Sequence, residues 1–241
     1  MNNRLNWLFT LLVFSYIGVL GEVMADEWAV RAGGAGQDKI RGLAVAEDGS
    51  IFIIGEFGQP GADFGKFKKT SAGELDFVLA KLSADGEFIW VASAGGPKID
   101  RGYAVCLADD GGCYVTGHFE SESIQFGDVE LQSQGDYDSF VAKYDSHGKC
   151  LWAKRQGGGG YDYGHGIAPD RKGGCVVSGA FAATGTFGEI VFEHSKGRRA
   201  FLLRLDANGE EKWVREAGTK VENTAGTMSG HNLTTDLKGN I

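Results

Sequence analysis

Short runs of apolar residues, five to eight long and bounded by glycine or aspartate, follow one another along most of the chain. They are rich in valine, isoleucine, phenylalanine, tyrosine and threonine, the residues that β-strands favour. Beyond residue 25 no stretch has the spacing of about 3.6 residues that marks a long amphipathic helix. Runs such as Ile51 to Ile54 are apolar at every position, which predicts strands covered on both faces. The pattern therefore predicts an all-β protein whose sheets pack face to face.

The same features return in the same order with a period of about 62 residues. Trp28, Trp90, Trp152 and Trp213 lie 62, 62 and 61 positions apart. An apolar strand and a small turn ending in glycine precede three of them. After the tryptophan come a Gly-Gly pair, an aspartate, an apolar segment, a glycine turn and a strand that ends in Gly-x-Phe. Such self-similarity is typical of one supersecondary unit repeated along the chain.

A repeated sheet that cannot bury both of its faces alone is expected to stack on its copies. We expect an all-β fold of the β-propeller class, with blades of about 62 residues and four strands, or five, in each. The expected domain covers residues 26–241, with complete repeats at about 29–90, 91–152 and 153–213 and a partial repeat at 214–241. The segment from Gly58 to Leu75 lengthens the repeat beyond the roughly 40–50 residues of common blades. A β-solenoid is the alternative architecture.

Two segments, Asp100 to Phe119 and Phe140 to Trp152, carry motifs of a known family. They contain Tyr-Val-Thr-Gly-x-Phe and Phe-Val-Ala-Lys-Tyr-Asp-x-x-Gly-x-x-Leu-Trp. This pattern resembles the SBBP-type β-propeller repeats of bacterial exported and cell-surface proteins, and the resemblance covers residues 28–241. It implies a secreted or surface scaffold, often attached to other modules. It implies no particular reaction, because a shared fold does not supply a function.

The ends of the repeat array depart from the pattern. Residues 233–241 match Ile167 to Cys175, so Ile241 stands where a central strand begins, and the chain opens on the Trp28 strand, the last strand of a blade. These pieces do not add up to one blade, and closed rings typically need four to eight blades. We therefore expect a fragment of a longer propeller, or incomplete rings that pair between chains. In both cases open strand edges favour association.

The first 25 residues have the features of a secretory signal peptide. Arg4 precedes an apolar stretch from Leu8 to Leu20, and Ala25 fits the small-residue cleavage rule. The stretch is shorter than the roughly 20 residues of a membrane span, although an uncleaved anchor is the alternative. We therefore expect an exported protein that is periplasmic, secreted or on the cell surface, with no membrane span after cleavage.

Charge and cysteine usage narrow the expected partners. The net charge of −8 repels phosphate backbones, so nucleic acid is not an expected partner. Sister repeats place apolar or small residues at the cysteine positions, which predicts buried thiols, with disulfides as the alternative. The five histidines are scattered, none at metal-ligand spacing from another, and no cofactor or metal is expected. The four cysteines are Cys106, Cys113, Cys150 and Cys175.

Five residues are candidates for binding. Asp38, Asp100 and Asp162 recur at the repeat period after the tryptophan strand. An aspartate there can fix its turn by accepting backbone N–H bonds, or the three carboxylates can together bind a cation or polar ligand. Tyr161 and Tyr163 flank Asp162 beside a glycine run, and aromatic rings with a carboxylate can hold a sugar. The tryptophans are expected to pack between blades.

Recurrence of these residues favours a non-catalytic scaffold, because a catalytic site needs unlike groups in unlike roles. We expect such a scaffold to bind an unknown protein or glycan at or outside the cell surface, and we do not expect an enzyme. One alternative is a quinoprotein-like enzyme domain, since Leu205 to Trp213 resembles the Gly-to-Trp turn of pyrroloquinoline quinone propellers. The other is a glycan-binding propeller.

Overall fold

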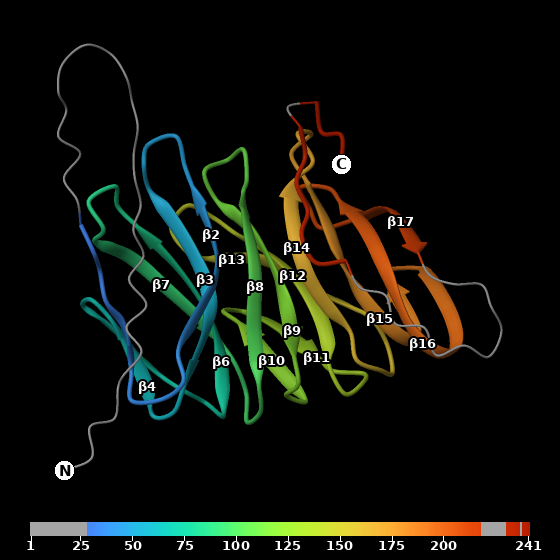
Figure 1. The fold of residues 1–241 in the computed structure, drawn as a ribbon, viewed down its shortest axis with the longest axis horizontal. Helices are drawn as coiled ribbons and strands as arrows, with labels where there is room; N and C mark the ends of the chain where they lie inside the picture. Colours follow the sequence, from blue (N-terminus) through green and yellow to red (C-terminus); the bar gives the residue numbers. More distant parts are fainter. Residues whose placement is uncertain (1–27, 218–229, 237) are drawn as a thin grey trace.

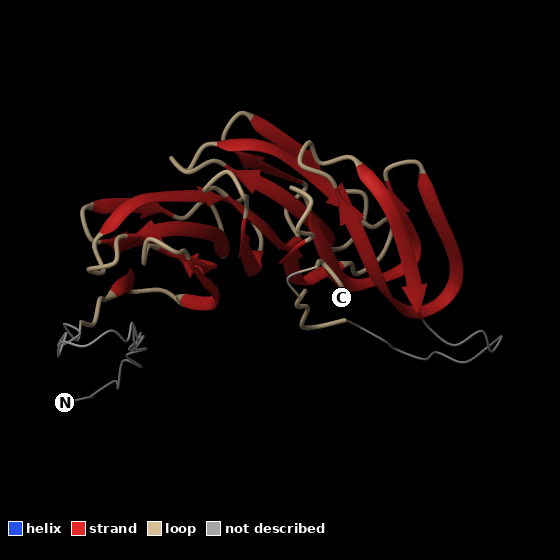
Figure 2. Ribbon diagram, turned by 90° about the horizontal axis from the view of Figure 1, so that it is seen from above, coloured by secondary structure: helices blue, strands red, loops and turns tan. Residues whose placement is uncertain are grey.

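The computed structural model describes residues 28–217, 230–236 and 238–241, and all of its regular structure is β-strand (Figure 2). The all-β prediction is therefore confirmed for these residues. No membrane-crossing helix is found in this part of the chain. The expected signal peptide and residues 218–229 of the partial repeat lie outside the described residues.

Three four-stranded antiparallel sheets follow one another along the chain, and in each the strands lie in sequence order. The first contains β2 (Lys39–Val45), β3 (Ile51–Gly58), β6 (Leu75–Leu82) and β7 (Phe88–Ala94). The second contains β8 (Asp100–Leu107), β9 (Cys113–Phe119), β12 (Asp138–Tyr144) and β13 (Cys150–Gln156). The third contains β14 (Tyr163–Pro169), β15 (Cys175–Phe187), β16 (Ile190–Leu205) and β17 (Glu211–Ala217). Each tryptophan-based repeat boundary thus falls inside the last strand of a sheet.

A hairpin between the second and third strands of each sheet accounts for the long repeat. The segment from Gly58 to Leu75 forms the hairpin of β4 (Gly61–Phe64) and β5 (Phe67–Thr70), and β10 (Ser123–Phe126) pairs with β11 (Val129–Gln132) in the same way. In the third sheet the hairpin continues β15 and β16, where Thr184 pairs with Glu193. β1 (Ala32–Gly34) pairs with β4.

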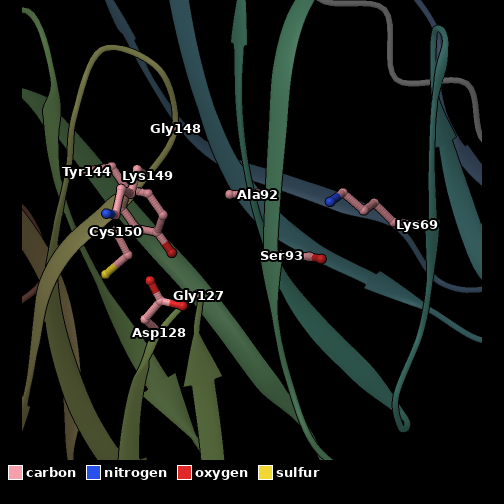
Figure 3. Close-up of a pocket in the computed structure, with 9 residues that line it drawn as sticks. All are labelled: Lys69, Ala92, Ser93, Gly127, Asp128, Tyr144, Gly148, Lys149 and Cys150. Atoms are coloured by element: carbon pink, nitrogen blue, oxygen red, sulfur yellow. The ribbon is translucent and has the colours of Figure 1, made fainter.

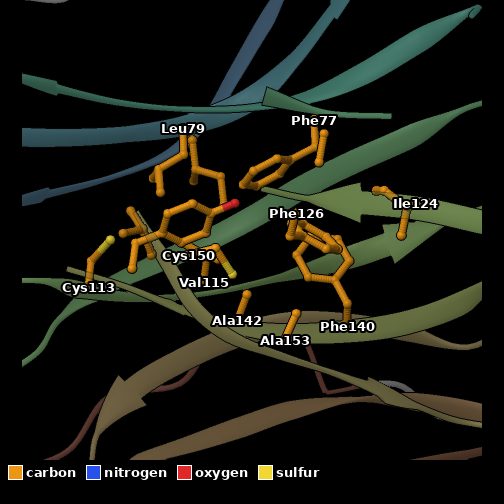
Figure 4. Close-up of a cluster of buried hydrophobic side chains, with 14 of the residues drawn as sticks. Phe77, Leu79, Cys113, Val115, Ile124, Phe126, Phe140, Ala142, Cys150 and Ala153 are labelled. Atoms are coloured by element: carbon orange, nitrogen blue, oxygen red, sulfur yellow. The ribbon is translucent and has the colours of Figure 1, made fainter. Parts of the chain in front are cut away.

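The three sheets are arranged in an open arc (Figure 2). Their first strands, β2, β8 and β14, contact one another in turn (Figure 1). The apolar faces of neighbouring sheets form the core. Phe77 of the first sheet meets Phe140 of the second edge-on, with 5.5 Å between ring centroids, and Phe126 of the β10–β11 hairpin joins them (Figure 4). Strands buried on both faces, such as β3, are therefore apolar at nearly every position.

The tryptophans fasten each segment to the sheet that follows it. Each indole Nε1 donates a hydrogen bond to a turn carbonyl: Trp28 to Ala84 at 2.9 Å, Trp90 to Ser146 at 2.9 Å and Trp152 to Ala207 at 3.0 Å. The indole of Trp90 also lies against Gly148, whose φ of +84° places the turn close to the ring. The expectation that the tryptophans pack between successive repeats is met at these three positions.

The expectation of strands at the two ends of the array is wrong. Residues 28–31 form no strand, and neither do the described residues from Gly230 onward. The described chain offers residues 28–31 no neighbouring strand of the kind that β6 provides for β7. The last segment instead lies beside the third sheet, where the Gly230 N–H donates to the Gly179 carbonyl and the Thr235 hydroxyl donates to the Pro169 carbonyl.

Candidate functional site

Equivalent positions on the first strands of the three sheets bring Arg41, Tyr103 and His165 into one column. The guanidinium of Arg41 lies 4.9 Å from the Tyr103 ring centroid, and the Tyr103 and His165 rings are 4.9 Å apart. His231, from the segment beside β14, stacks on His165 at 4.6 Å. The column forms because β2, β8 and β14 run side by side, so side chains at the same register become neighbours.

Four more rings pack around this column. The His118 ring lies 5.4 Å from Tyr103 and 5.3 Å from Tyr137. Tyr163 stacks on His165 with an interplanar angle of 10° and meets His118 edge-on. We call this group the aromatic cluster. Its members are Tyr103, His118, Tyr137, Tyr161, Tyr163, His165 and His231.

Charged groups surround the aromatic cluster. Glu56 is buried and forms a bidentate ion pair with Arg41, in which Nη2 and Oε1 are 2.6 Å apart. Arg101 lies 3.9 Å from the same carboxylate. Glu120 is 3.8 Å from His118 Nε2. The guanidinium of Arg198 lies 5.0 Å from the centroid of the Tyr163 ring.

Two histidines of the cluster, His118 and His165, are held in the neutral form. The pKa of His165 is lowered to about 4, mainly by burial and in addition by the nearby His231, His118, Arg198 and Arg41. Burial also lowers the pKa of His118, although the Glu120 carboxylate opposes this shift. Since imidazole has an unperturbed pKa of about 6.5, the His118 and His165 rings act at neutral pH as uncharged aromatic surfaces.

A groove of about 240 Å³ opens beside the column. Its walls include Arg41, Tyr103, His165 and Leu233, and exposed Leu43 extends its apolar part. The arrangement of rings, guanidinium groups and an open groove is suited to holding a ligand by stacking and charge.

A second hollow, of about 210 Å³, lies where the first two sheets meet (Figure 3). Asp128 and Cys150 lie on one side of it and Lys69 on the opposite side, so its polar side chains do not converge. Cys150 is buried, and burial raises the pKa of its thiol to about 12. This hollow therefore lacks the converging polar groups of a binding site.

The three predicted aspartates bond to backbone N–H groups. Asp38 accepts from Gly34 at 2.7 Å, and Asp162 accepts from Gly158 at 2.6 Å and Ala182 at 2.8 Å. Asp100 accepts four hydrogen bonds, from the N–H groups of Gly96, Glu120 and Ser121 and from the Ser121 hydroxyl. These hydrogen bonds match the first of the two expected roles, in which each aspartate fixes its turn by accepting backbone N–H bonds. Burial raises the pKa of Asp162 to about 7, although the backbone donors oppose the shift.

Tyr161 and Tyr163 both belong to the aromatic cluster. Tyr161 meets Tyr137 edge-on at 4.8 Å and remains 44% exposed. Asp162 lies between them in sequence and is fully buried, because alternate residues of an extended chain face opposite sides. The structure thus brings the two predicted tyrosines together and assigns the aspartate between them to the turn.

Sequence reasoning missed the rest of the cluster. His118, His165 and His231 give no signal of a site in the sequence, because none stands at metal-ligand spacing from another. The available signal was the repeat register: Arg41, Tyr103 and His165 are 62 positions apart, and His231 precedes Leu233 as His165 precedes Ile167. No group of three or more potential metal ligands was found among the described residues.

The cysteines are free thiols, and all four are buried. Cys113 and Cys175 lie in the β9 and β15 strands, at the position that Ile51 occupies in β3. They fill the space of a small apolar side chain, as the repeat comparison predicts, and the disulfide alternative is not realised in this structure.

No known family model matches the chain, so the SBBP-type resemblance remains a prediction. The chain is 24% identical over 229 residues to the regulatory protein FlaEY of Caulobacter vibrioides, covering 86% of this chain and 23% of that protein. It is 22% identical over 154 residues to an uncharacterised WD repeat-containing protein of Acanthamoeba polyphaga mimivirus, covering 58% of this chain and 11% of that protein. The chain thus spans less than a quarter of the length of either relative, and the name of the second one agrees with the repeat-like, β-rich fold described above.

Proposed function

We propose that the chain forms blades of a β-propeller that acts as an exported, non-catalytic binding scaffold. Three features support the propeller: sheets of the same strand order repeat along the chain, their first strands lie side by side, and tryptophans fasten successive repeats. The sheets follow an open arc (Figure 2), and an arc of successive sheets is compatible with a ring of blades. The similarity to a WD repeat-containing protein agrees with this architecture.

The main support for a binding role is a contrast between two sets of residues. The residues that hold the sheets together recur in every repeat, whereas the residues of the column differ between repeats. Tryptophan, the turn glycine and the turn aspartate recur from repeat to repeat, whereas Arg41, Tyr103 and His165 differ at one repeat position. Stacked aromatic rings and arginines are enriched where proteins recognise ligands and partners. The proposed scaffold therefore has the same structural residues in each repeat, and the side chains on its first strands form a surface that is specific to this protein.

Electron microscopy of the full-length protein tests the architecture. We expect sheets related by rotation about one axis, with β2, β8 and β14 nearest to it. Sheets stacked along a line without a common axis contradict the proposal.

Export is proposed from the features of residues 1–25, and it is tested by cell fractionation of the protein with and without that segment. If both forms remain in the cytoplasm, the proposed export is contradicted.

The quinoprotein-like alternative is tested separately by adding pyrroloquinoline quinone with Ca²⁺ to the purified protein. We expect no shift in the quinone absorbance and no dye-linked dehydrogenase activity. Measurable turnover of an alcohol or an aldose contradicts the non-catalytic role.

A further inference from the structure

We propose that the aromatic cluster binds an acidic carbohydrate, with the sugar ring against the tyrosine faces and the carboxylate against Arg198. This inference rests on the proposed binding function and gives it a ligand class. It also extends the glycan-binding alternative, because it requires that the bound sugar carry a negative charge.

The tyrosines at the start of β14 provide the stacking surface. Tyr161 is 44% exposed, and Tyr137 and Tyr163 are partly exposed beside it. Tyr137 touches both of the others, at 4.8 Å and 5.7 Å between ring centroids. Rings fixed by one another in this way offer apolar area together with phenolic hydroxyls, which suits the C–H faces and hydroxyl groups of a sugar.

The charges around these rings favour an anion. Among the described residues, the guanidinium groups of Arg41, Arg101 and Arg198 lie at the cluster together with the carboxylates of Glu56 and Glu120, and the buried Asp100 also acts on His118. Glu56 is occupied by Arg41, and within the described residues Arg198 has no carboxylate partner. Positive groups, among them Arg198 and Arg41, act on His165, in a chain whose net charge is −8. Guanidinium groups bind carboxylates with geometry that a lysine does not reproduce.

His118 provides an independent observation, a buried polar ring beside the tyrosines. Its side chain is fully buried under the tyrosines, and neither ring nitrogen has a hydrogen-bond partner among the described residues. Glu120 lies 3.8 Å from Nε2, beyond hydrogen-bond distance. Buried polar atoms without partners are rare and costly, and they are often completed by a ligand or a water molecule.

Isothermal titration calorimetry of the full-length protein with three probes tests the proposal. The probes are trigalacturonate, the neutral trisaccharide galactotriose, and citrate as a tricarboxylate without a sugar ring. We expect trigalacturonate to bind at least about tenfold more tightly than either of the others, a difference of about 1.4 kcal/mol. The affinity is expected to fall as salt is added, since the arginines are partly exposed.

Two variants localise the binding, and a third is the matched control. Arg198→Gln and Tyr161→Ala are each expected to weaken trigalacturonate binding about tenfold. Tyr161 is largely exposed, so its variant remains informative if Arg198→Gln does not fold. Arg215→Gln removes another arginine that lies over an aromatic ring, that of Trp213, and should leave the affinity unchanged.

Each contrary result identifies the part that fails. Equal affinity for galactotriose overturns the charge requirement, and equal affinity for citrate overturns the sugar requirement. If none of the three probes binds to a protein that microscopy shows to be a ring, the ligand assignment is wrong while the proposed scaffold stands. If no ring is seen, the proposed function fails whatever the calorimetry gives.

Discussion

Trp90 of the first sheet donates its indole N–H to the backbone carbonyl of Ser146 in the second sheet, at 2.9 Å. The two residues are 56 positions apart, and the same donor and acceptor positions recur for Trp28 with Ala84. A buried indole needs a partner for its N–H. The hydrogen bond therefore fixes the position of one sheet on the next. Apolar packing alone would define that position less specifically.

The turn glycine under this indole gives the first prediction. A Cβ on Gly148 would lie 2.7 Å from an indole atom of Trp90, whereas one on Gly111 would lie 3.9 Å from its nearest neighbour. Both glycines have φ near +80°. Gly111→Ala should therefore cost about 1–2 kcal/mol of unfolding free energy from backbone strain. Gly148→Ala should cost a further 1–3 kcal/mol or so from overpacking. Urea denaturation measures both, and equal losses would show that the indole moves freely.

The buried turn aspartates give a second prediction. Asp100 accepts four hydrogen bonds and is fully buried, whereas Asp38, at the same repeat position, accepts one from Gly34 and is only half-buried. Asp100→Ala should destabilise the protein by roughly 3 kcal/mol or more, because it leaves several buried donors unpaired. Asp38→Ala should cost about 1 kcal/mol. Thermal and urea unfolding compare the two, and a smaller loss for Asp100→Ala contradicts the turn-fixing role.

His165 predicts a loss of stability in acid. Its folded pKa of about 4 lies below the ordinary value of 6.5. Between these values the unfolded chain binds a proton that the native protein does not, so unfolding free energy falls as the pH drops from about 6.5 to about 4. His165→Gln should reduce this fall.

The difference between urea midpoints at pH 7 and pH 4.5 measures the effect of His165. His147→Gln, on an exposed turn, is the control and should keep the slope of the unaltered protein. If His165→Gln and His147→Gln have the same slope, then His165 is not held in its neutral form by the cluster.

The cysteines give a fourth prediction. All four thiols are buried, and burial raises the pKa of Cys113 well above its usual range and that of Cys150 to about 12. Since the thiolate is the reactive form, the native protein should react with a disulfide reagent such as dithiobis-nitrobenzoate only after unfolding. In denaturant four thiols should be labelled. Rapid labelling of any one in the native state contradicts the buried environment.

The repeat framework was predictable because each of its residues has a local physical task that returns every 62 positions. Trp90 and its sister tryptophans, the turn glycines, and apolar strands such as Ile51 to Ile54 reveal strand content and order from spacing alone. The β4–β5 hairpin was harder to predict, because its exposed strand positions, such as Lys68, weaken the apolar pattern. The ends were predicted wrongly, because Trp28 carries the repeat signal whether or not a neighbouring strand is there to pair with it.

The aromatic cluster was predictable only in part. Tyr161 and Tyr163 stand out locally, as two rings beside a glycine run. Arg41 and His165 do not stand out, because they become neighbours only when three strands lie side by side. A comparison of repeats looks for residues that recur, so it passes over positions at which the side chains differ. Arg198 reaches Tyr163 through the pairing of β15 with β16, which no sequence spacing encodes.

Each repeat has two sets of residues with different roles. One set holds successive sheets together, and the other forms the column on the first strands. Exchanging Tyr103 or His165 for another residue changes the chemistry of this surface, while the indole-to-carbonyl hydrogen bonds and the aspartate-held turns stay as they are. Arg41 is less free to change, because it pairs with the buried Glu56. Under the proposed function, substitutions at this one position in each repeat would change which ligand is bound, while the residues that order the sheets are kept.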